Sequence, residues 1–219
     1  MAKSVLSPIQ RQIIEYLSKD TNFIKNFYLT GGTALSEFYL HHRLSEDLDF
    51  FTETEVDKIW LNTLAKRISG LITAKKHDIQ ESFNRNLVFF TTSSGIIKTE
   101  FTYFPMPQIT PPKIINGIPI DSEVDIAVNK LFTIYQKPLA RHFIDLYLLL
   151  TTKSYKWEEL EKLARAKFDA NIDPIQMGSS LIQARDIQDL PRMIINLPDK
   201  KWRDYFIKKA LSFKEKILK

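Results

Sequence analysis

The sequence contains no cysteine, so disulfide bonds and cysteine-ligated zinc sites are excluded. It also lacks any uninterrupted apolar run of the ~18 residues that a membrane-spanning helix needs. The first residues, Met1 to Leu6, have neither the apolar core nor the cleavage site of a signal peptide. We therefore expect a cytoplasmic protein with no membrane partner.

The composition is that of an ordinary globular protein. Of the 219 residues, 44% are hydrophobic and 26% are charged, which is enough to build a sizeable core. Basic residues exceed acidic residues and leave a net charge of +5. This excess favours a polyanionic partner such as RNA, although lysine-rich helices on a soluble protein explain it equally well.

The first half of the chain mixes helical and strand-like patterns of apolar residues. The predicted helices span about 8–19, 33–42 and 56–68, and the predicted strands span 27–30, 48–51, 71–79, 87–92 and 96–103. Five of the ten prolines then fall within 105–119, which we interpret as a linker. We therefore expect an α/β domain over 1–104.

Every pattern beyond the proline-rich segment is helical. Helices are predicted at 124–134, 139–150 and 157–168, from Pro174 onward, and at 202–218. The sequence thus predicts an α+β protein whose mixed first domain is followed by an all-helical domain over 120–219.

Residues 28–51 combine a strand, a Gly-Gly helix start and an Asp-x-Asp strand. Gly31 and Gly32 let the backbone approach phosphates closely, and the helix start adds free N–H groups. The hydroxyl of Thr33 can add a further phosphate contact. This part of the motif predicts a site for the phosphates of a nucleotide.

Asp47 and Asp49 lie two residues apart in an extended run, so both carboxylates leave the same face. Two like charges held so close are costly unless a cation lies between them. Hard oxygen ligands suit Mg²⁺, or Mn²⁺ in its place, and Glu100 on a neighbouring predicted strand is a candidate third ligand. Taken singly, a Gly-Gly pair is usually a turn and Asp-x-Asp a solvated strand end, so the order of these features is what predicts metal-dependent nucleotidyl transfer.

Two stretches, Tyr28–Leu35 (YLTGGTAL) and Arg43–Phe50 (RLSEDLDF), resemble the AbiEii/AbiGii toxin family. That family belongs to the polymerase-β-like nucleotidyltransferase superfamily. The resemblance extends to Asp125–Leu131 (DIAVNKL) and Arg141–Tyr147 (RHFIDLY). It implies a polymerase-β-like nucleotidyltransferase fold with a mixed sheet and flanking helices, followed by a C-terminal helical bundle that completes the active-site cleft. Arg43 and Ser45 of the second stretch join the predicted nucleotide-binding residues.

The resemblance also maps an active-site lysine and a helix aspartate onto Lys130 and Asp145. Lys130 would neutralise the triphosphate, and Asp145 would orient it or act as a base. Without the resemblance, a surface lysine and a carboxylate paired with Arg141 would be the simpler interpretation. Many family members have an aspartate where this chain has His142, and if that residue were the catalytic one the role of Asp145 would fail.

The predicted activity is transfer of NMP from an NTP to an acceptor hydroxyl. The resemblance implies that the acceptor is RNA, particularly the tRNA 3′ end, and that the protein is a toxin controlled by a cognate antitoxin. Trp202, Tyr205 and Phe206 in the basic tail would stack on RNA bases, or would instead form the core of a closing helix. Two alternatives stay open: transfer to a protein or small molecule, and an inactive nucleotide- or RNA-binding module.

Overall fold

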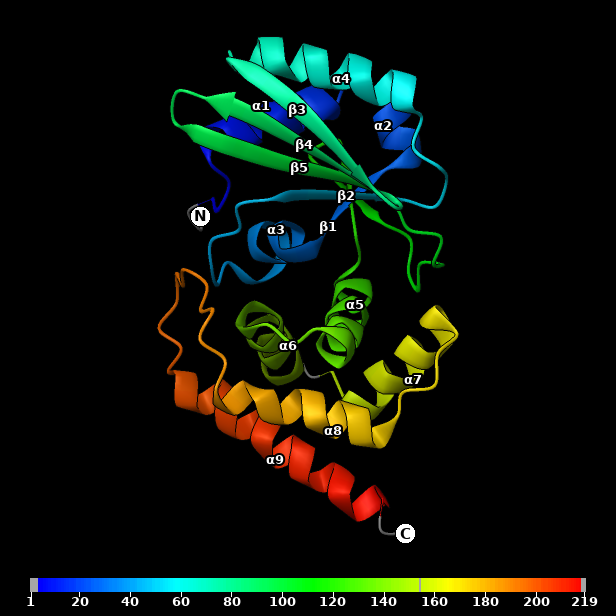
Figure 1. Ribbon diagram of the computed structural model, residues 1–219, viewed down its shortest axis with the longest axis vertical. Helices are drawn as coiled ribbons and strands as arrows, with labels where there is room; N and C mark the ends of the chain where they lie inside the picture. The colour runs from blue at the N-terminus through cyan, green and yellow to red at the C-terminus, as the bar shows by residue number, and fades with distance from the viewer. Residues whose placement is uncertain (1–3, 154, 218–219) are drawn as a thin grey trace. The chain divides into compact units, whose positions relative to one another are not determined.

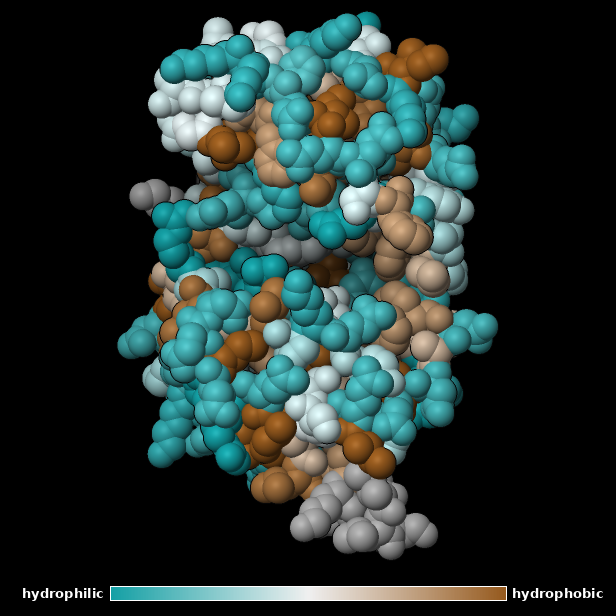
Figure 2. All heavy atoms as spheres, in the orientation of Figure 1, coloured by the Kyte–Doolittle hydropathy of each residue, from teal (hydrophilic) through white to brown (hydrophobic). Residues whose placement is uncertain are grey.

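The computed structural model describes residues 4–153 and 155–217 (Figure 1). The chain forms two compact units, Met1–Pro107 with Pro111–Ser122 and Gln108–Thr110 with Glu123–Lys219. The first unit carries the sheet and the second is helical. Hydrophilic side chains cover most of the face drawn in Figure 2, with smaller apolar groups between them. No helix in the described ranges has the length and apolarity to cross a bilayer.

The sheet of the first unit is mixed, because its central strand has one antiparallel and one parallel neighbour. Its strand order is β3-β4-β5-β2-β1-β7-β6 in the described part of the chain. The strands are β1 (Tyr28–Thr30), β2 (Leu48–Thr52), β3 (Lys76–Ser82), β4 (Arg85–Thr92), β5 (Gly95–Tyr103), β6 (Lys113–Ile115) and β7 (Ile118–Ile120).

Aromatic residues of the helices pack on one face of this sheet. The helices of this unit are α1 (Pro8–Leu17), α2 (Thr21–Asn26), α3 (Gly31–Leu35), which continues as a π-helix over Ser36–Leu40, and α4 (Lys58–Leu71). Phe23 of α2 meets Phe50 of β2 with ring centroids 5.0 Å apart, and Trp60 of α4 meets Phe101 of β5 at 5.9 Å. Because side chains alternate along a strand, residues next to Phe50 and Phe101 lie on the opposite face.

The first helix begins as the sequence predicts. Ser7 accepts a hydrogen bond from the backbone N–H of Gln10, and the Gln10 side chain accepts one from the backbone of Ser7. Pro8 occupies the first turn, where its missing N–H costs nothing. The strand expected over 71–79 begins and ends later than predicted, because Leu71 still belongs to α4 and β3 spans Lys76–Ser82.

The segment 105–119, which the sequence analysis interprets as a linker, differs from that expectation. β6 and the first two residues of β7 lie within it, and β7 joins the sheet parallel to β1. Asn116 and Gly117 between them have φ values of 52° and 79°, which is typical of a two-residue hairpin turn. This Asn-Gly turn lies inside the proline-rich segment, and the hairpin is held to the sheet by Ile118 and Ile120 of β7, which are buried, whereas Ile114 of β6 is exposed.

The second unit is a bundle of helices around an aromatic core. Its main helices are α5 (Glu123–Gln136), α6 (Ala140–Thr152), α7 (Trp157–Phe168), α8 (Pro174–Ile182) and α9 (Asp199–Ile217). Asp173 caps α8 by accepting from the N–H of Gln176, as the Asp-Pro pair predicts. The predicted end of the last helix, Leu218, lies outside the described residues.

Two aromatic residues of α9 belong to this core. Trp202 and Phe206 are fully buried, and both rings pack against Phe143 of α6. Of the two interpretations of these aromatic residues, stacking on RNA bases is therefore wrong for Trp202 and Phe206, since neither ring is accessible. The alternative, an amphipathic helix that closes the bundle, holds for these two residues.

A buried ion pair holds a short segment of the chain to the bundle. Lys167 of α7 lies 2.6 Å from Asp125 of α5, and both side chains are almost completely buried. The Asp125 carboxylate also accepts from the backbone N–H groups of Ile109 and Thr110. Because Lys167 and these two N–H groups converge on one carboxylate, the segment 108–110 belongs to the helical unit although its neighbours do not.

We expect Trp202→Ala to destabilise the protein by ~3–5 kcal/mol, because the substitution leaves a large cavity in a closed core. Urea unfolding followed by circular dichroism measures this change. Lys201→Ala, at an exposed neighbouring position, is the matched control and should change the stability by less than ~0.5 kcal/mol. A Trp202→Ala protein that kept its stability but lost RNA binding would restore the stacking role.

Candidate active site

Asp49 lies at the centre of the polar face of the sheet. In the strand register, it stands opposite Thr30 of β1 and beside Glu100 of β5. Its neighbour Phe50 is fully buried on the other face, so Asp49 is directed away from the aromatic core. The structure thus brings Asp49 and Glu100 together on adjacent parallel strands.

The two glycines place the start of α3 directly against these residues. Gly31 has a φ of +71°, and a Cβ there would lie 2.5 Å from the Asp49 carboxylate oxygen Oδ2. A Cβ on Gly32 would overlap the Arg43 guanidinium and lie 2.9 Å from the Ser45 hydroxyl. The motif therefore gathers Gly31, Gly32, Arg43, Ser45 and Asp49 into one small region, and the close approach requires glycine.

Thr33 has a different role from the one predicted. Its side chain is fully buried, and its hydroxyl donates to the backbone carbonyl of Asp47. The hydroxyl therefore holds the chain at the entry to β2 and does not face solvent, where a phosphate would bind. This geometry corrects the phosphate contact that the sequence analysis assigns to Thr33.

Asp47, which precedes β2, forms an ion pair that the sequence analysis missed. Lys98 Nζ of β5 lies 2.7 Å from Asp47 Oδ2, and both side chains are partly exposed. Lys98 stands two residues before Glu100, so alternation along β5 places both on one face. That spacing is the signal that would have found Lys98.

Glu100 is held by a second cation, Arg85 at the start of β4. Arg85 Nε and Nη2 donate to the two Glu100 oxygens at 2.7 and 2.6 Å, and the hydroxyl of Thr102 donates to Oε1 at 2.7 Å. The hydrogen bond to Glu100 raises the pKa of Arg85 above its ordinary value. Burial alone would raise the pKa of Glu100, but the hydrogen bonds from Arg85 and Thr102 and the charges of Arg85 and Lys98 hold it below its usual range. Glu100 is therefore ionised.

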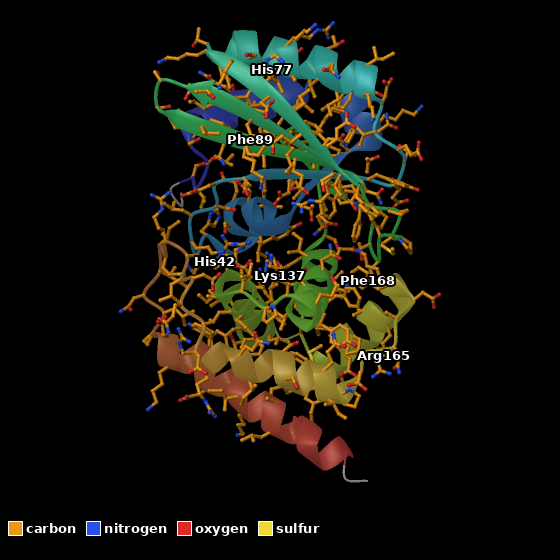
Figure 3. The ribbon with its side chains drawn as sticks, in the orientation of Figure 1. His42, His77, Phe89, Lys137, Arg165 and Phe168 are labelled. Carbon is orange, nitrogen blue, oxygen red and sulfur yellow. The ribbon has the colours of Figure 1, made fainter. Side chains whose placement is uncertain are left out.

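Asp121, just after β7, fixes the approach to the Gly-Gly turn. The buried hydroxyl of Thr30 donates to Asp121 Oδ2 at 2.6 Å, and the hydroxyl of Tyr39 donates to the Asp121 carbonyl at 2.8 Å. Asp121 is not among the predicted site residues, because it lies directly after the proline-rich segment interpreted as a linker. His42, labelled in Figure 3, follows the π-helix and is completely buried, as expected for a packed histidine.

The helical unit contains its own cluster of predicted residues. Lys130 Nζ of α5 lies 2.8 Å from Asp145 Oδ2 of α6 and 3.4 Å from His142 Nδ1. The side chains of Lys130 and Asp145 are 8% and 0% exposed, so they form a buried pair, whereas Arg141 is exposed. Asp145 is thus a carboxylate that faces Lys130 even with a histidine at position 142.

The carboxylates of the first unit offer a donor set that suits a hard cation. Asp47 lies just before β2 and its carboxylate pairs with Lys98, while the Asp49 carboxylate lies next to Gly31. Among the described residues, no group of three or more His, Cys, Asp or Glu side chains is arranged to hold a metal ion. Two carboxylates with water and substrate phosphates nevertheless suffice for Mg²⁺, so Asp47 and Asp49 fit this ion. Glu100 as a third ligand stays a prediction.

Comparison with known proteins adds independent support. The sequence model of the family described as nucleotidyl transferase AbiEii toxin, type IV TA system, matches residues 15–214. The chain belongs to this family. An uncharacterised protein of Aquifex aeolicus, aq_aa25, is 32% identical over 184 residues, which cover 82% of this chain and 84% of that protein.

Solved structures share the fold of this AbiEii-family chain. An H. pylori protein described as a nucleotidyltransferase has a TM-score of 0.63 at 20% identity and covers 96% of this chain and 97% of that chain. MenT4, a nucleotidyltransferase toxin of Mycobacterium tuberculosis, has a TM-score of 0.56 at 16% identity. The match covers 93% of this chain and 80% of the MenT4 chain. The predicted α+β nucleotidyltransferase fold and the family resemblance are confirmed.

The AbiEii-family protein is a nucleotidyltransferase. Membership of a type IV toxin family implies an NTP substrate and a cognate antitoxin. The individual roles of Asp47, Asp49, Glu100, Lys130 and Asp145 stay predictions. The same holds for the division into domains at 1–104 and 120–219 and for the helical domain completing the site.

We expect Gly31→Ala to lower both stability and nucleotidyl transfer. The left-handed backbone costs a non-glycine residue ~1–3 kcal/mol, and the added methyl group displaces the Asp49 carboxylate. Urea unfolding and a transfer assay measure the two effects. Gly70→Ala is the matched control, because a Cβ there meets nothing within 4 Å and should leave transfer unchanged. Unaltered transfer by Gly31→Ala would contradict the close packing of Gly31 on Asp49.

Proposed function

We propose that this enzyme transfers NMP from an NTP to the 3′ end of RNA, with tRNA as the acceptor, and that it depends on Mg²⁺ or Mn²⁺. The observation that carries the proposal is the position of Asp49, which lies between the Gly-Gly turn and Glu100 on one face of the sheet. This arrangement suits a polyphosphate at the turn and an ion at the carboxylates.

In this reaction the oxygen of the acceptor hydroxyl attacks the α-phosphorus and its proton passes to solvent. The bond from the α-phosphorus to the oxygen that bridges it to the β-phosphorus breaks, and pyrophosphate leaves. Asp47 and Asp49 would hold the divalent ion, which when bound supplies positive charge to the phosphates. Gly31 and Gly32 allow the backbone to approach the phosphates, while Arg43 and Ser45 line the region beside Gly32. The protein contributes position and charge, which dominate catalysis of phosphoryl and nucleotidyl transfer.

The helical unit supplies the second part of the proposal. Lys130 would neutralise charge on the nucleotide, and Asp145 would hold the lysine side chain in position. Because Asp145 is 0% exposed and 2.8 Å from Lys130, orientation fits its geometry better than the role of a base. These assignments rest on the family resemblance and on this buried pair.

The RNA acceptor is supported by charge more than by stacking. The net charge is +5, and Lys200, Lys201 and Lys208 of α9 are exposed. Exposed lysines bind a phosphate backbone without reading its sequence. Trp202 and Phe206 contribute nothing to such a surface, because both are buried. As a type IV toxin, the enzyme would act in a system where a cognate antitoxin limits its effect.

We expect label to move from one of the four α-labelled NTPs to total tRNA in the presence of Mg²⁺. Asp47→Asn and Asp49→Asn should each reduce transfer more than about a hundredfold, because each removes a charged ligand. Asp78→Asn, at an exposed site on β3, is the control and should keep the wild-type rate.

Label that appears on protein or on a small molecule, but not on tRNA, would overturn the RNA acceptor. No transfer to any acceptor would favour a nucleotide-binding module. Thermal melting of each variant shows whether a lost activity reflects the site or the fold.

We expect Lys130→Met to abolish transfer and also to destabilise the fold by ~3–5 kcal/mol, since it leaves Asp145 buried without its cation. The double variant Lys130→Met with Asp145→Asn removes both charges and should regain much of that stability. If Lys130 acts on the nucleotide, transfer stays lost in the stabilised double variant. Recovery of transfer together with stability would show that the pair has only a structural role.

A further inference from the structure

Arg85 is placed on the polar face of the sheet by the register of β4 against β5. Leu87 stands opposite Glu100, and Arg85 lies two residues before Leu87, so both share the face that carries Glu100. β5 lies between β4 and β2 in the sheet (Figure 1), and Glu100 of β5 is in register with Asp49 of β2. Arg85 therefore reaches the same face as the carboxylates of the candidate site.

The two side chains of the Arg85–Glu100 ion pair differ in their solvent exposure. The Glu100 side chain is 6% exposed, whereas that of Arg85 is 55% exposed. Two donors from Arg85 and one from Thr102 converge on Glu100. Because Glu100 already accepts these three hydrogen bonds, its carboxylate is suited to hold Arg85 in one position.

The guanidinium keeps donors that Glu100 does not use. Arginine presents five N–H donors in a planar fork, and the Glu100 carboxylate accepts from Nε and Nη2. The remaining N–H groups belong to a half-exposed side chain, and the negative charges of Asp49 and Asp47 also help to raise the pKa of Arg85. An ion pair with one exposed partner stabilises a fold only weakly, so stability alone does not account for this arrangement.

We propose that Arg85 binds a phosphate group of the substrate, and that Glu100 positions Arg85 for this contact. The inference rests on the proposed function, because it assumes that the nucleotide lies on the face that carries Asp49. A planar guanidinium held by a carboxylate on one edge offers its other edge to phosphate oxygens, a geometry that lysine does not match. The phosphate belongs either to the NTP or to the backbone of the RNA acceptor.

The decisive variants are Arg85→Gln, Glu100→Gln and their combination. Binding of the four α,β-methylene NTP analogues with Mg²⁺ is measured by calorimetry, and binding of total tRNA by filter retention. We expect Arg85→Gln to lower the affinity for one of these two ligands about tenfold, because the substitution removes a charge-assisted contact. Weaker analogue binding assigns the phosphate to the NTP, and weaker tRNA binding assigns it to the acceptor.

Glu100→Gln should weaken the same ligand, and the double variant should bind no more weakly than Arg85→Gln alone, because both residues act through one contact. Arg85→Lys should recover only part of the affinity, and KM for the affected substrate should rise more than kcat falls. Lys58→Gln is the matched control, since Lys58 also forms an ion pair, with Glu81, at an exposed position.

Affinity for Mn²⁺ without nucleotide, followed by electron paramagnetic resonance, separates the two roles of Glu100. If Glu100 only positions Arg85, Glu100→Gln leaves the affinity for Mn²⁺ at the wild-type value. Weaker Mn²⁺ binding by Glu100→Gln would overturn the anchor role in favour of a third metal ligand.

Equal binding of all analogues and of tRNA by Arg85→Gln and wild type would overturn the inference alone. A wild-type protein that bound neither ligand would overturn the inference and the proposed function together.

Discussion

The position of β2 between an antiparallel and a parallel neighbour is the constraint on which the site depends. Thr30 of β1 and Glu100 of β5 are both in register with Asp49. Because side chains alternate along a strand, a shift of one residue in either pairing would turn Asp49 toward the aromatic core. The burial of Phe50 and Phe101 opposes that shift, so the apolar face keeps the polar face in place.

The polar face in turn depends on alternating charges. Lys98 holds Asp47 and Arg85 holds Glu100, so each of these two carboxylates has a cation of the same unit beside it. Uncompensated carboxylates at such spacing would repel one another. The helical unit follows a similar rule, since Lys130 with Asp145 and Lys167 with Asp125 are buried as pairs. Breaking such a pair costs more than exchanging it for apolar residues.

Much of the fold was accessible from the sequence, because local signals specify it. The capping box at Ser7, the Asp-Pro start of α8 and the helical spacing of α7 all form where the residues predict them. The site motif from β1 to β2 was also recognisable, since its glycines and aspartates lie close together in the chain. The hairpin of β6 and β7 was missed because a composition break at the prolines outweighed a two-residue turn signal.

What the sequence by itself determined is the arrangement from Tyr28 to Thr52: a strand, a Gly-Gly helix start, and two aspartates two residues apart at the next strand. Only the tertiary structure decided which partners these residues have. Arg85 with Glu100, Lys98 with Asp47 and Asp121 with Thr30 are separated by 15 to 91 residues along the chain. Such contacts follow from strand order and register, and both arise from packing of the whole sheet.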